Sequence, residues 1–263
     1  MTAKQRALEA LIESHAQELK LPTVKARFKA LADETTREGQ TPVAYLAALL
    51  EAELTDRQER RQRRRMKEAR FPLPKRIEDF RFNDNPNVSR STVASLVDCD
   101  WIDRKEAVIL IGDAGTGKTH LATGLAVAAA HQGRRVRFTT LAALANELKE
   151  ADSSLELRRA VARYTRYELL LIDELGYLKL PAGVAELVFQ VISERSERGA
   201  VMVTSNLPFG EWTKVFTEAR LAQAVVDRLT HNAHIIDTGS ESWRFEHGLA
   251  RQAAHNARCE AGG

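Results

Sequence analysis

The stretch Ala107–Ala122, AVILIGDAGTGKTHLA, places the strongest constraint on what this chain can fold into. Within it, Gly112–Thr119 has two glycines separated by four residues and followed by Lys and Thr, which is the pattern of a phosphate-binding P-loop. The apolar run before the loop predicts a buried parallel strand, and the apolar residues after it recur at helical spacing. Backbone N–H groups of such a loop and the positive end of the helix dipole point at phosphate. Lys118 would then reach the β- and γ-phosphates, and the Thr119 hydroxyl would hold Mg²⁺.

The composition is typical of a soluble globular protein, because 44% of the 263 residues are hydrophobic and 29% are charged. No apolar run approaches the ~20 residues that span a bilayer, and the N-terminal segment lacks the apolar core of a secretory leader. Two cysteines provide no disulfide framework, and the seven histidines show no zinc-ligand spacing. We therefore expect a cytoplasmic protein without a membrane partner.

Residues 1–70 are predicted to form a small all-α domain, because apolar residues recur at helical spacing along three segments. Thr41-Pro42 has the pattern of a helix N-cap followed by a first-turn proline. Phe71-Pro72-Leu73-Pro74 ends the last helix and marks the domain boundary, so residues 71–263 form the second domain. A helical unit of this size buries little surface alone, and we expect it to pack with a partner or with a second copy of itself.

The net charge of +3 conceals a local concentration of positive charge. Residues 57–76 contain ten Lys or Arg and only two Glu, so the rest of the chain is net negative. A charge run of this kind is either a solvated linker helix or a surface that contacts DNA phosphates, and the sequence leaves both interpretations open. The candidate DNA contacts in the run are Arg60, Arg61, Arg63, Arg64 and Arg65.

Beyond residue 107, segments predicted as strands alternate with segments predicted as helices. This alternation indicates an α/β fold with an open parallel sheet flanked by helices, and ligand binds such a sheet at the carboxyl ends of its strands. The predicted strands are 108–111, 135–139, 168–174, 200–204 and 234–236. The helices predicted after the one that follows the P-loop are 141–150, 155–164, 181–198, 221–229 and 243–257.

Two acidic residues close one of these strands. Asp173 stands where a P-loop protein carries the aspartate that completes the Mg²⁺ shell, and Glu174 is suited to orient and deprotonate the attacking water. Asn206 follows the next strand, where its amide would position the water or touch the γ-phosphate, or would simply favour a turn. Nothing in the chain matches the Asn-Lys-x-Asp motif that reads guanine, so ATP is the predicted nucleotide. Small nucleotide kinases also carry P-loops, but they usually have an arginine-bearing lid and no such helical N-terminal domain.

Several motifs together resemble one family over nearly the whole chain. They resemble the IstB family, AAA+ ATPases that assist the IstA transposase of bacterial insertion sequences and are related to the helicase loader DnaC and the initiator DnaA. The family usually has Ser-Tyr-Arg where this chain has Ser-Trp-Arg, so Trp243 is a departure. The motifs are Gly112–Thr119, Leu170–Glu174, Thr204–Asn206, Val226–Leu229 and Gly239–Arg244.

The resemblance implies an AAA+ core and a role for each matching residue. Asp173 and Thr119 would bind Mg²⁺, Glu174 would be the catalytic base, and Asn206 matches the first sensor position. Arg228 matches the arginine finger that reaches the ATP of a neighbouring subunit, and Arg244 matches the second sensor region. The residues expected to bind ATP are Gly112, Asp113, Ala114, Gly115, Thr116, Gly117, Lys118, Thr119, His120 and Arg244.

The resemblance also implies DNA binding by extra helices between the second and third strands. In this chain those helices are 141–164, and their acidic residues dilute the positive charge. We expect contacts to the DNA backbone without readout of bases. The candidate contacts are Lys149, Arg158, Arg159 and Arg163.

Two functions share all of these motifs. In the first, the chain is an ATP-driven regulator that forms a homo-oligomer on duplex DNA and stimulates an IstA-like transposase. In the second, it is a replicative helicase loader of the DnaC type. The basic run favours the first, because it suits duplex backbone binding.

Overall fold

The computed structural model describes residues 2–240, and the chain divides into two compact units, Met1–Arg64 and Arg65–Gly263. The units divide before the boundary that the sequence predicts. Arg65 donates to the Gly133 carbonyl at 3.1 Å, and Ala69 and Phe71 pack in the core of the second unit. No helix in this described part of the chain is long and apolar enough to cross a membrane.

The first unit is helical, as predicted. It contains α1 (Ala3–Glu18), α2 (Pro22–Arg37) and the first part of α3 (Pro42–Ala69). Prolines at the first positions of α2 and α3 supply a fixed φ without losing a helical hydrogen bond. The core is small, consisting of Ala16, Val24, Phe28 and Leu49.

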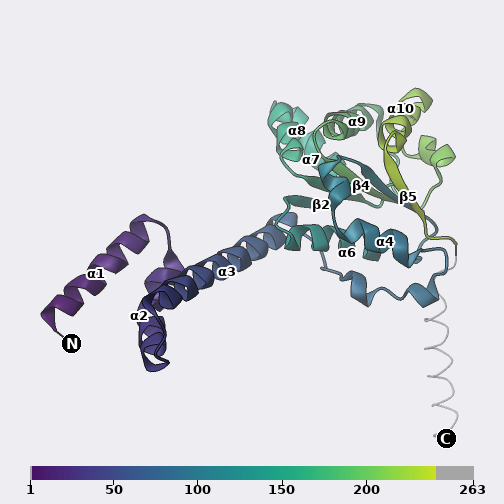
Figure 1. Ribbon diagram of the computed structural model, residues 1–263. Coiled ribbons are helices and arrows are strands. Elements are labelled where there is room, and N and C mark those ends of the chain that lie inside the picture. The colour runs from purple at the N-terminus through teal and green to yellow at the C-terminus, as the bar shows by residue number, and fades with distance from the viewer. Residues whose placement is uncertain (1, 241–263) are drawn as a thin grey trace, which may run out of the picture. The chain divides into compact units, whose positions relative to one another are not determined.

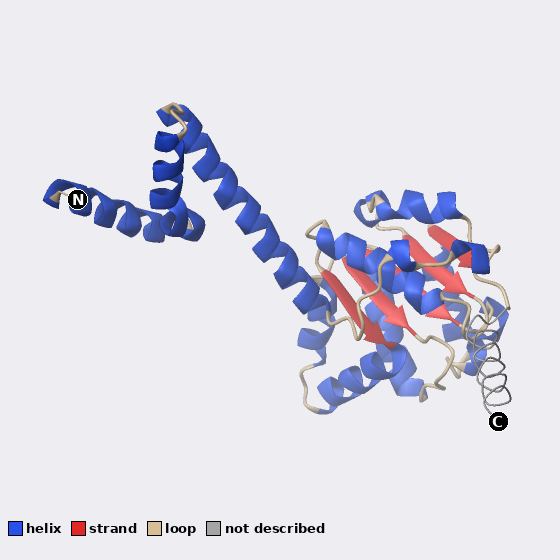
Figure 2. Cartoon of the chain, turned by 90° about the horizontal axis from the view of Figure 1, so that it is seen from below, coloured by secondary structure: helices blue, strands red, loops and turns tan. Residues whose placement is uncertain are grey.

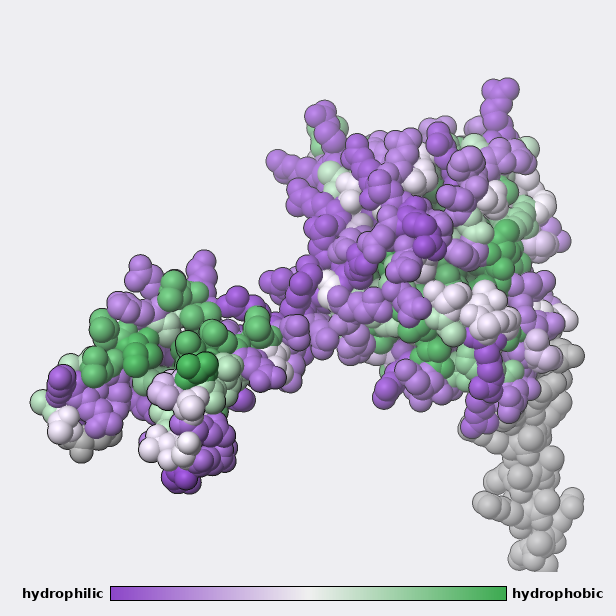
Figure 3. Space-filling view, viewed as in Figure 1, coloured by the Kyte–Doolittle hydropathy of each residue, from purple (hydrophilic) through white to green (hydrophobic). Residues whose placement is uncertain are grey.

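A buried carboxylate completes the first unit. Glu53 of α3 accepts hydrogen bonds from the backbone N–H groups of Thr23 and Val24 at 2.8 and 3.1 Å, so it satisfies the N-terminus of α2. Large apolar side chains remain exposed, and Figure 3 shows hydrophobic residues gathered on the visible face of these helices. The exposed large apolar side chains of the first unit are Leu8, Leu11, Ile12, Leu19, Val43, Leu46, Leu50 and Leu54.

The second unit is built on a five-stranded sheet in the order β2-β3-β4-β1-β5, and every adjacent pair is parallel. Figure 2 shows the strands side by side with helices packed around them. The predicted α/β fold is therefore confirmed, with each strand within a residue or two of its expected place. The strands are β1 (Ala107–Ile111), β2 (Val136–Thr140), β3 (Leu169–Asp173), β4 (Ala200–Ser205) and β5 (Ala233–Asp237).

The helices of this unit cover both faces of the sheet (Figure 1). On one face, α4 (Arg90–Val97) and α6 (Lys118–His131) pack with Val108, Leu110 and Leu171 of the strands. On the other face, four helices pack with Ile109, Ile172 and neighbouring strand residues. Alternate residues of β1, β3 and β4 thus enter opposite cores, as strands buried on both faces require. The four helices are α7 (Leu141–Ser153), α8 (Leu157–Thr165), α9 (Ala182–Ser196) and α10 (Ala219–Thr230).

Short elements complete the second unit. Two single-turn 3₁₀ helices lie before the sheet, and a third follows β4. The predicted helix 243–257 lies outside the described residues. The short elements are η1 (Ile77–Asp79), η2 (Phe82–Asp84), α5 (Asp100–Asp103) and η3 (Phe209–Lys214).

Candidate functional site

The P-loop connects the end of β1 to the first turn of α6. Gly115 and Gly117 have φ of 88° and 94°, in the left-handed region that favours glycine. A Cβ atom on Gly117 would lie 2.6 Å from the Phe80 ring, so this position admits no side chain without a shift. The loop is therefore tightly packed and leads directly into the N-terminus of α6, which is the geometry of an anion site.

Lys118 is the first residue of α6, and its side chain turns back over the loop. Its Nζ donates to the carbonyl oxygens of Gly112 and Asp113 at 2.7 and 2.6 Å. The side chain is buried, so its charge acts in a medium that screens less than water. The Lys118 ammonium group therefore lies at the loop, where it would contact a bound anion.

The loop is held from behind by residues that the sequence did not single out. Asn85 is buried, and its Nδ2 donates to the carbonyls of Thr116 and Thr238, each at 3.0 Å. The hydroxyls of Thr116 and Thr238 lie 2.6 Å apart. Asp113 N–H donates to Gly239 O at 2.9 Å. No local pattern marks Asn85 or Thr238, because each gains its contact from a residue more than thirty positions away in the sequence.

The acidic pair lies beside the loop, at the end of β3. Asp173 is 3% exposed, and its Oδ1 accepts hydrogen bonds from the Thr119 hydroxyl at 3.0 Å and from the Thr204 hydroxyl. Glu174 is exposed and has a φ of 64°. The predicted partners Thr119 and Asp173 are thus in direct contact.

These residues fit Mg²⁺ better than a transition metal. The described residues contain no cluster of three His, Cys, Asp or Glu that could hold a metal ion by itself. Mg²⁺ in nucleotide sites usually takes one or two hard oxygen ligands from the protein and completes its shell with phosphate oxygens and water. A hydroxyl and a carboxylate beside a phosphate loop supply that set.

Asn206 faces the same region from the end of β4. Its Oδ1 is buried and has no hydrogen-bond partner among the residues that the structure describes. A Cβ atom on Gly176, whose φ is 146°, would lie 2.1 Å from this oxygen, so glycine leaves the room that the amide occupies. The Asn206 residue lines the cavity, while this oxygen is packed against Gly176.

The P-loop, Glu174 and Asn206 line one cavity of about 450 Å³. Its other wall is the segment before the sheet, where Phe80 packs edge-on against His120 with ring centroids 5.6 Å apart. No local sequence pattern indicates that Lys75 and Arg81 line the cavity. The wall residues are Lys75, Asp79, Phe80, Arg81, Asp84 and Asn85.

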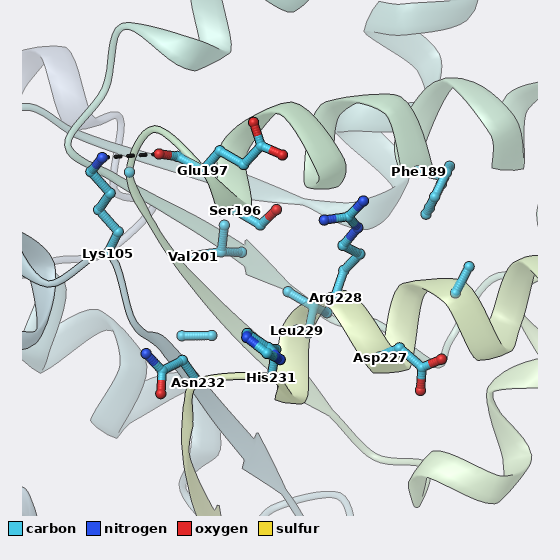
Figure 4. Close-up of a pocket in the computed structure, with 13 residues that line it drawn as sticks. Lys105, Phe189, Ser196, Glu197, Val201, Asp227, Arg228, Leu229, His231 and Asn232 are labelled. Carbon is cyan, nitrogen blue, oxygen red and sulfur yellow. Dashed lines mark hydrogen bonds between the residues drawn. The ribbon is translucent and has the colours of Figure 1, made fainter.

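Arg228 lies in a different place. It lines a second cavity of about 550 Å³ together with Ala107 and Val201, which stand at the beginnings of β1 and β4 (Figure 4). In this view Arg228 extends from α10 toward α9, while Asp227 points the other way. The P-loop follows the end of β1, and a five-residue strand spans roughly 16 Å. Arg228 is therefore too far from the P-loop of its own chain to touch a phosphate there.

The candidate DNA contacts differ in how their charge is used. Arg60 pairs with Glu53 at 3.0 Å, and Arg65, with a side chain 14% exposed, bonds Gly133 and Glu68. Arg61, Lys149 and Arg158 are exposed, as is Arg64. Arg244 lies outside the described residues. Three further candidates are exposed and form ion pairs, Arg63 with Glu59, Arg159 with Glu156 and Arg163 with Glu147.

A parallel sheet in this order, with a P-loop after β1 and an acidic pair after β3, defines a P-loop nucleotide-binding protein of the AAA+ class. Solved AAA+ structures share the fold. DnaA from Aquifex aeolicus bound to AMPPCP superposes with a TM-score of 0.55 at 18% identity, covering 67% of this chain and 53% of that one. The DnaC helicase loader superposes with a TM-score of 0.51 at 18% identity, covering 63% and 92%.

The chain belongs to the family of IstB-like ATP binding proteins, whose profile matches residues 14–251. It is 36% identical over 237 residues to an insertion sequence ATP-binding protein of Sinorhizobium fredii, covering 90% of this chain and 80% of the relative. It is 35% identical over 234 residues to the ATP-binding protein of insertion sequence IS5376 from Geobacillus stearothermophilus, covering 89% and 93%. The predicted resemblance is thus confirmed.

Proposed function

We propose that this chain is a Mg²⁺-dependent ATPase that assembles on duplex DNA and regulates a partner transposase. The observation that carries the proposal is that Lys118, Thr119 and Glu174 line one cavity and that Asp173 contacts Thr119 beside it. The names of both relatives tie the family to insertion sequences, which move by transposition.

The cavity supplies what binding of ATP requires. The loop N–H groups, the N-terminus of α6 and the Lys118 ammonium would receive the triphosphate. The base and ribose would lie toward the opposite wall, which includes Phe80 and Arg81. Thr119 and Asp173 would hold Mg²⁺ against the phosphates, and the ion would supply neutralisation of the charge that develops there.

Hydrolysis needs a base and an oriented water. Glu174 is exposed to the cavity, so its carboxylate would accept the proton of the attacking water. Asn206, which lines the cavity, would position the same water or touch the γ-phosphate. Arg228 would complete the site of a neighbouring copy, because it lies too far from the P-loop of its own chain.

We assign the DNA contacts from exposed positive charge and the partner-binding surface from exposed apolar side chains. The exposed arginines of α3, with Lys149 and Arg158 on α7 and α8, would contact the phosphate backbone. The exposed leucines of the first unit form the kind of surface that a partner protein or a second copy covers. A replicative helicase loader is the alternative, and only a fold-level likeness at 18% identity supports it.

Phosphate release by the purified chain, measured with no DNA, with duplex DNA and with a single strand of equal length, tests the proposal. We expect Mg²⁺-dependent turnover that duplex DNA stimulates more than the single strand does. Stimulation by the single strand alone would favour the loader, and the absence of turnover under all three conditions would remove the ATPase assignment.

A further inference from the structure

One buried hydroxyl lies between the two acidic residues of the site. Thr204 stands near the end of β4 and is 2% exposed. Its Oγ1 donates to Asp173 Oδ1 and accepts a hydrogen bond from the backbone N–H of Glu174 at 3.1 Å. A single side chain on the neighbouring strand therefore contacts both members of the acidic pair.

The contact to Glu174 fixes the point at which the chain leaves the sheet. Glu174 has a φ of 64°, a conformation that non-glycine residues rarely adopt and that needs support from the surrounding structure. Thr204 supplies this support twice, because its carbonyl also accepts the N–H of Leu175 at 2.9 Å. The turn ends β3 at Asp173 and exposes Glu174 to the cavity instead of extending the buried strand.

The contact to Asp173 fixes the orientation of its carboxylate. The Oδ1 atom accepts from two hydroxyls, those of Thr119 and Thr204, whereas no hydrogen bond to Oδ2 is found within residues 2–240. With both hydroxyl protons directed to Oδ1, Oδ2 stays available to an ion or its water, and the Thr119 oxygen keeps its lone pairs. Groups that orient a metal ligand in this way commonly matter almost as much as the ligand itself.

We infer that Thr204 is the positioning residue of this site, which holds the Asp173 carboxylate toward Mg²⁺ and the Glu174 side chain toward the attacking water. The inference rests on the proposed ATPase function and deepens it. Threonine suits the task, because its β-branch stiffens the side chain and favours a strand, while its hydroxyl both donates and accepts. The sequence hides this role, since a threonine in a strand is ordinary.

The test compares Thr204→Val, which keeps the shape and removes the hydroxyl, with Thr204→Ser, which keeps the hydroxyl. The matched control is Thr139→Val, because Thr139 is also buried in a strand of the same sheet but its hydroxyl bonds the Thr140 carbonyl and, within residues 2–240, neither acidic residue. Four quantities are measured for each full-length variant: the melting temperature, the Kd for ATP in EDTA, the Mg²⁺ concentration that half-saturates tight ATP binding, and kcat.

We expect Thr204→Val to bind ATP normally in EDTA, since the P-loop is unchanged. Its half-saturating Mg²⁺ concentration should rise and its kcat should fall, each by about tenfold or more. This is the range seen when the partner of a metal ligand is removed. Thr204→Ser should have a Mg²⁺ requirement and a kcat close to those of the unmodified chain. Thr139→Val should change neither quantity.

Two results would overturn the inference. One is a Thr204→Val protein with the Mg²⁺ requirement and kcat of the unmodified chain. The other is an equal loss in Thr204→Val and Thr139→Val that follows their melting temperatures, which would make the hydroxyl merely structural. If the unmodified chain hydrolyses no ATP, the ATPase proposal fails separately, and the Mg²⁺ dependence of ATP binding still decides the role of Thr204.

Discussion

At the scale of single residues, Lys118 and Glu174 line the same cavity, and replacing each should impair a different step. Lys118→Ala removes the only lysine of the P-loop and should abolish detectable ATP binding, because the remaining loop side chains bring no positive charge. Glu174→Gln keeps the shape of the side chain and removes the proposed base, so it should bind ATP normally and lose about 10²–10⁴ in kcat. Equilibrium titration with a fluorescent ATP analogue and phosphate release measure the two effects.

The Gln variant also has a control within the same turn. Tyr177 lines the cavity but is given no task in the reaction, so Tyr177→Phe should keep both ATP binding and turnover. Normal turnover by Glu174→Gln would exclude Glu174 as the base and leave Asn206 as the residue to test next.

At the scale of elements, one buried arginine ties α8 and α9 to the sheet. Arg195 is fully buried, and its guanidinium donates to the carbonyls of Tyr164, Glu168 and Ala200 at 3.1, 3.2 and 2.6 Å, and also to that of Tyr167. Burial lowers the pKa of Arg195 to about 10, so the group is still charged at neutral pH.

Replacing Arg195 by Met should therefore destabilise the second unit by about 3 kcal/mol, because several buried carbonyls lose their donor at once. Urea unfolding followed by circular dichroism measures the change. Arg198→Met serves as the control, since Arg198 is exposed just beyond the same helix and should cost less than about 0.5 kcal/mol. Equal destabilisation by the two variants would contradict this role for Arg195.

A second element-scale prediction concerns the basic run of α3. Arg60 and Arg65 already serve the fold through Glu53 and Gly133, so Arg61, Arg63 and Arg64 are the ones to neutralise together. Each phosphate contact contributes a slope of about −0.9 to log K against log salt for duplex DNA. The triple Gln variant should flatten the slope by up to about 2.7 if each arginine contacts one phosphate.

The matched control removes the same charge elsewhere in the first unit, as Lys4, Arg6 and Lys20 to Gln. Fluorescence anisotropy of a labelled duplex between 50 and 300 mM salt gives both slopes. An unchanged slope in the α3 variant would indicate that the basic run is a solvated helix that does not contact DNA. Equal flattening in both variants would show that only net charge matters.

At the scale of the whole molecule, what the sequence could predict depended on how local each signal is. The strands carry continuous apolar runs, and the P-loop carries its glycines within eight residues, so both were found without tertiary information. The cavity wall, the anchor Asn85 and the hydroxyl of Thr204 were not found, because each gains its role from residues distant in the sequence. The basic run looked uniform for the same reason, since the buried Glu53 that pairs with Arg60 lies outside it.

The last prediction concerns the proposal that Arg228 acts in the site of a neighbouring copy. Within one chain, the proposed site has a lysine, the candidate Mg²⁺ ligands and a candidate base. Arg228 stands at the opposite edge of the sheet, exposed and without an ion pair among the described residues. A second cation that offsets charge on the γ-phosphate contributes about 10³–10⁵ in rate in phosphoryl transfer. If Arg228 provides it, the arginine must come from the neighbouring copy.

Mixing two inactive variants tests this arrangement. Lys118→Ala lacks a working P-loop but keeps Arg228, whereas Arg228→Ala keeps the P-loop and lacks the arginine. Each alone should be nearly inactive, and Arg228→Ala should still bind ATP. In a mixed assembly, an Arg228→Ala subunit next to a Lys118→Ala subunit has both an intact P-loop and a neighbour's arginine, so hydrolysis should partly return.

The ratio of the two variants makes the prediction quantitative. Recovered activity should be greatest near equal amounts, because it requires unlike neighbours, and it should vanish toward either pure variant. Arg220→Ala in place of Arg228→Ala is the control, since Arg220 is an exposed arginine at the other end of α10. If mixed assemblies form, as tagged subunits pulled down together would show, and no activity returns, then Arg228 does not act on the neighbouring site.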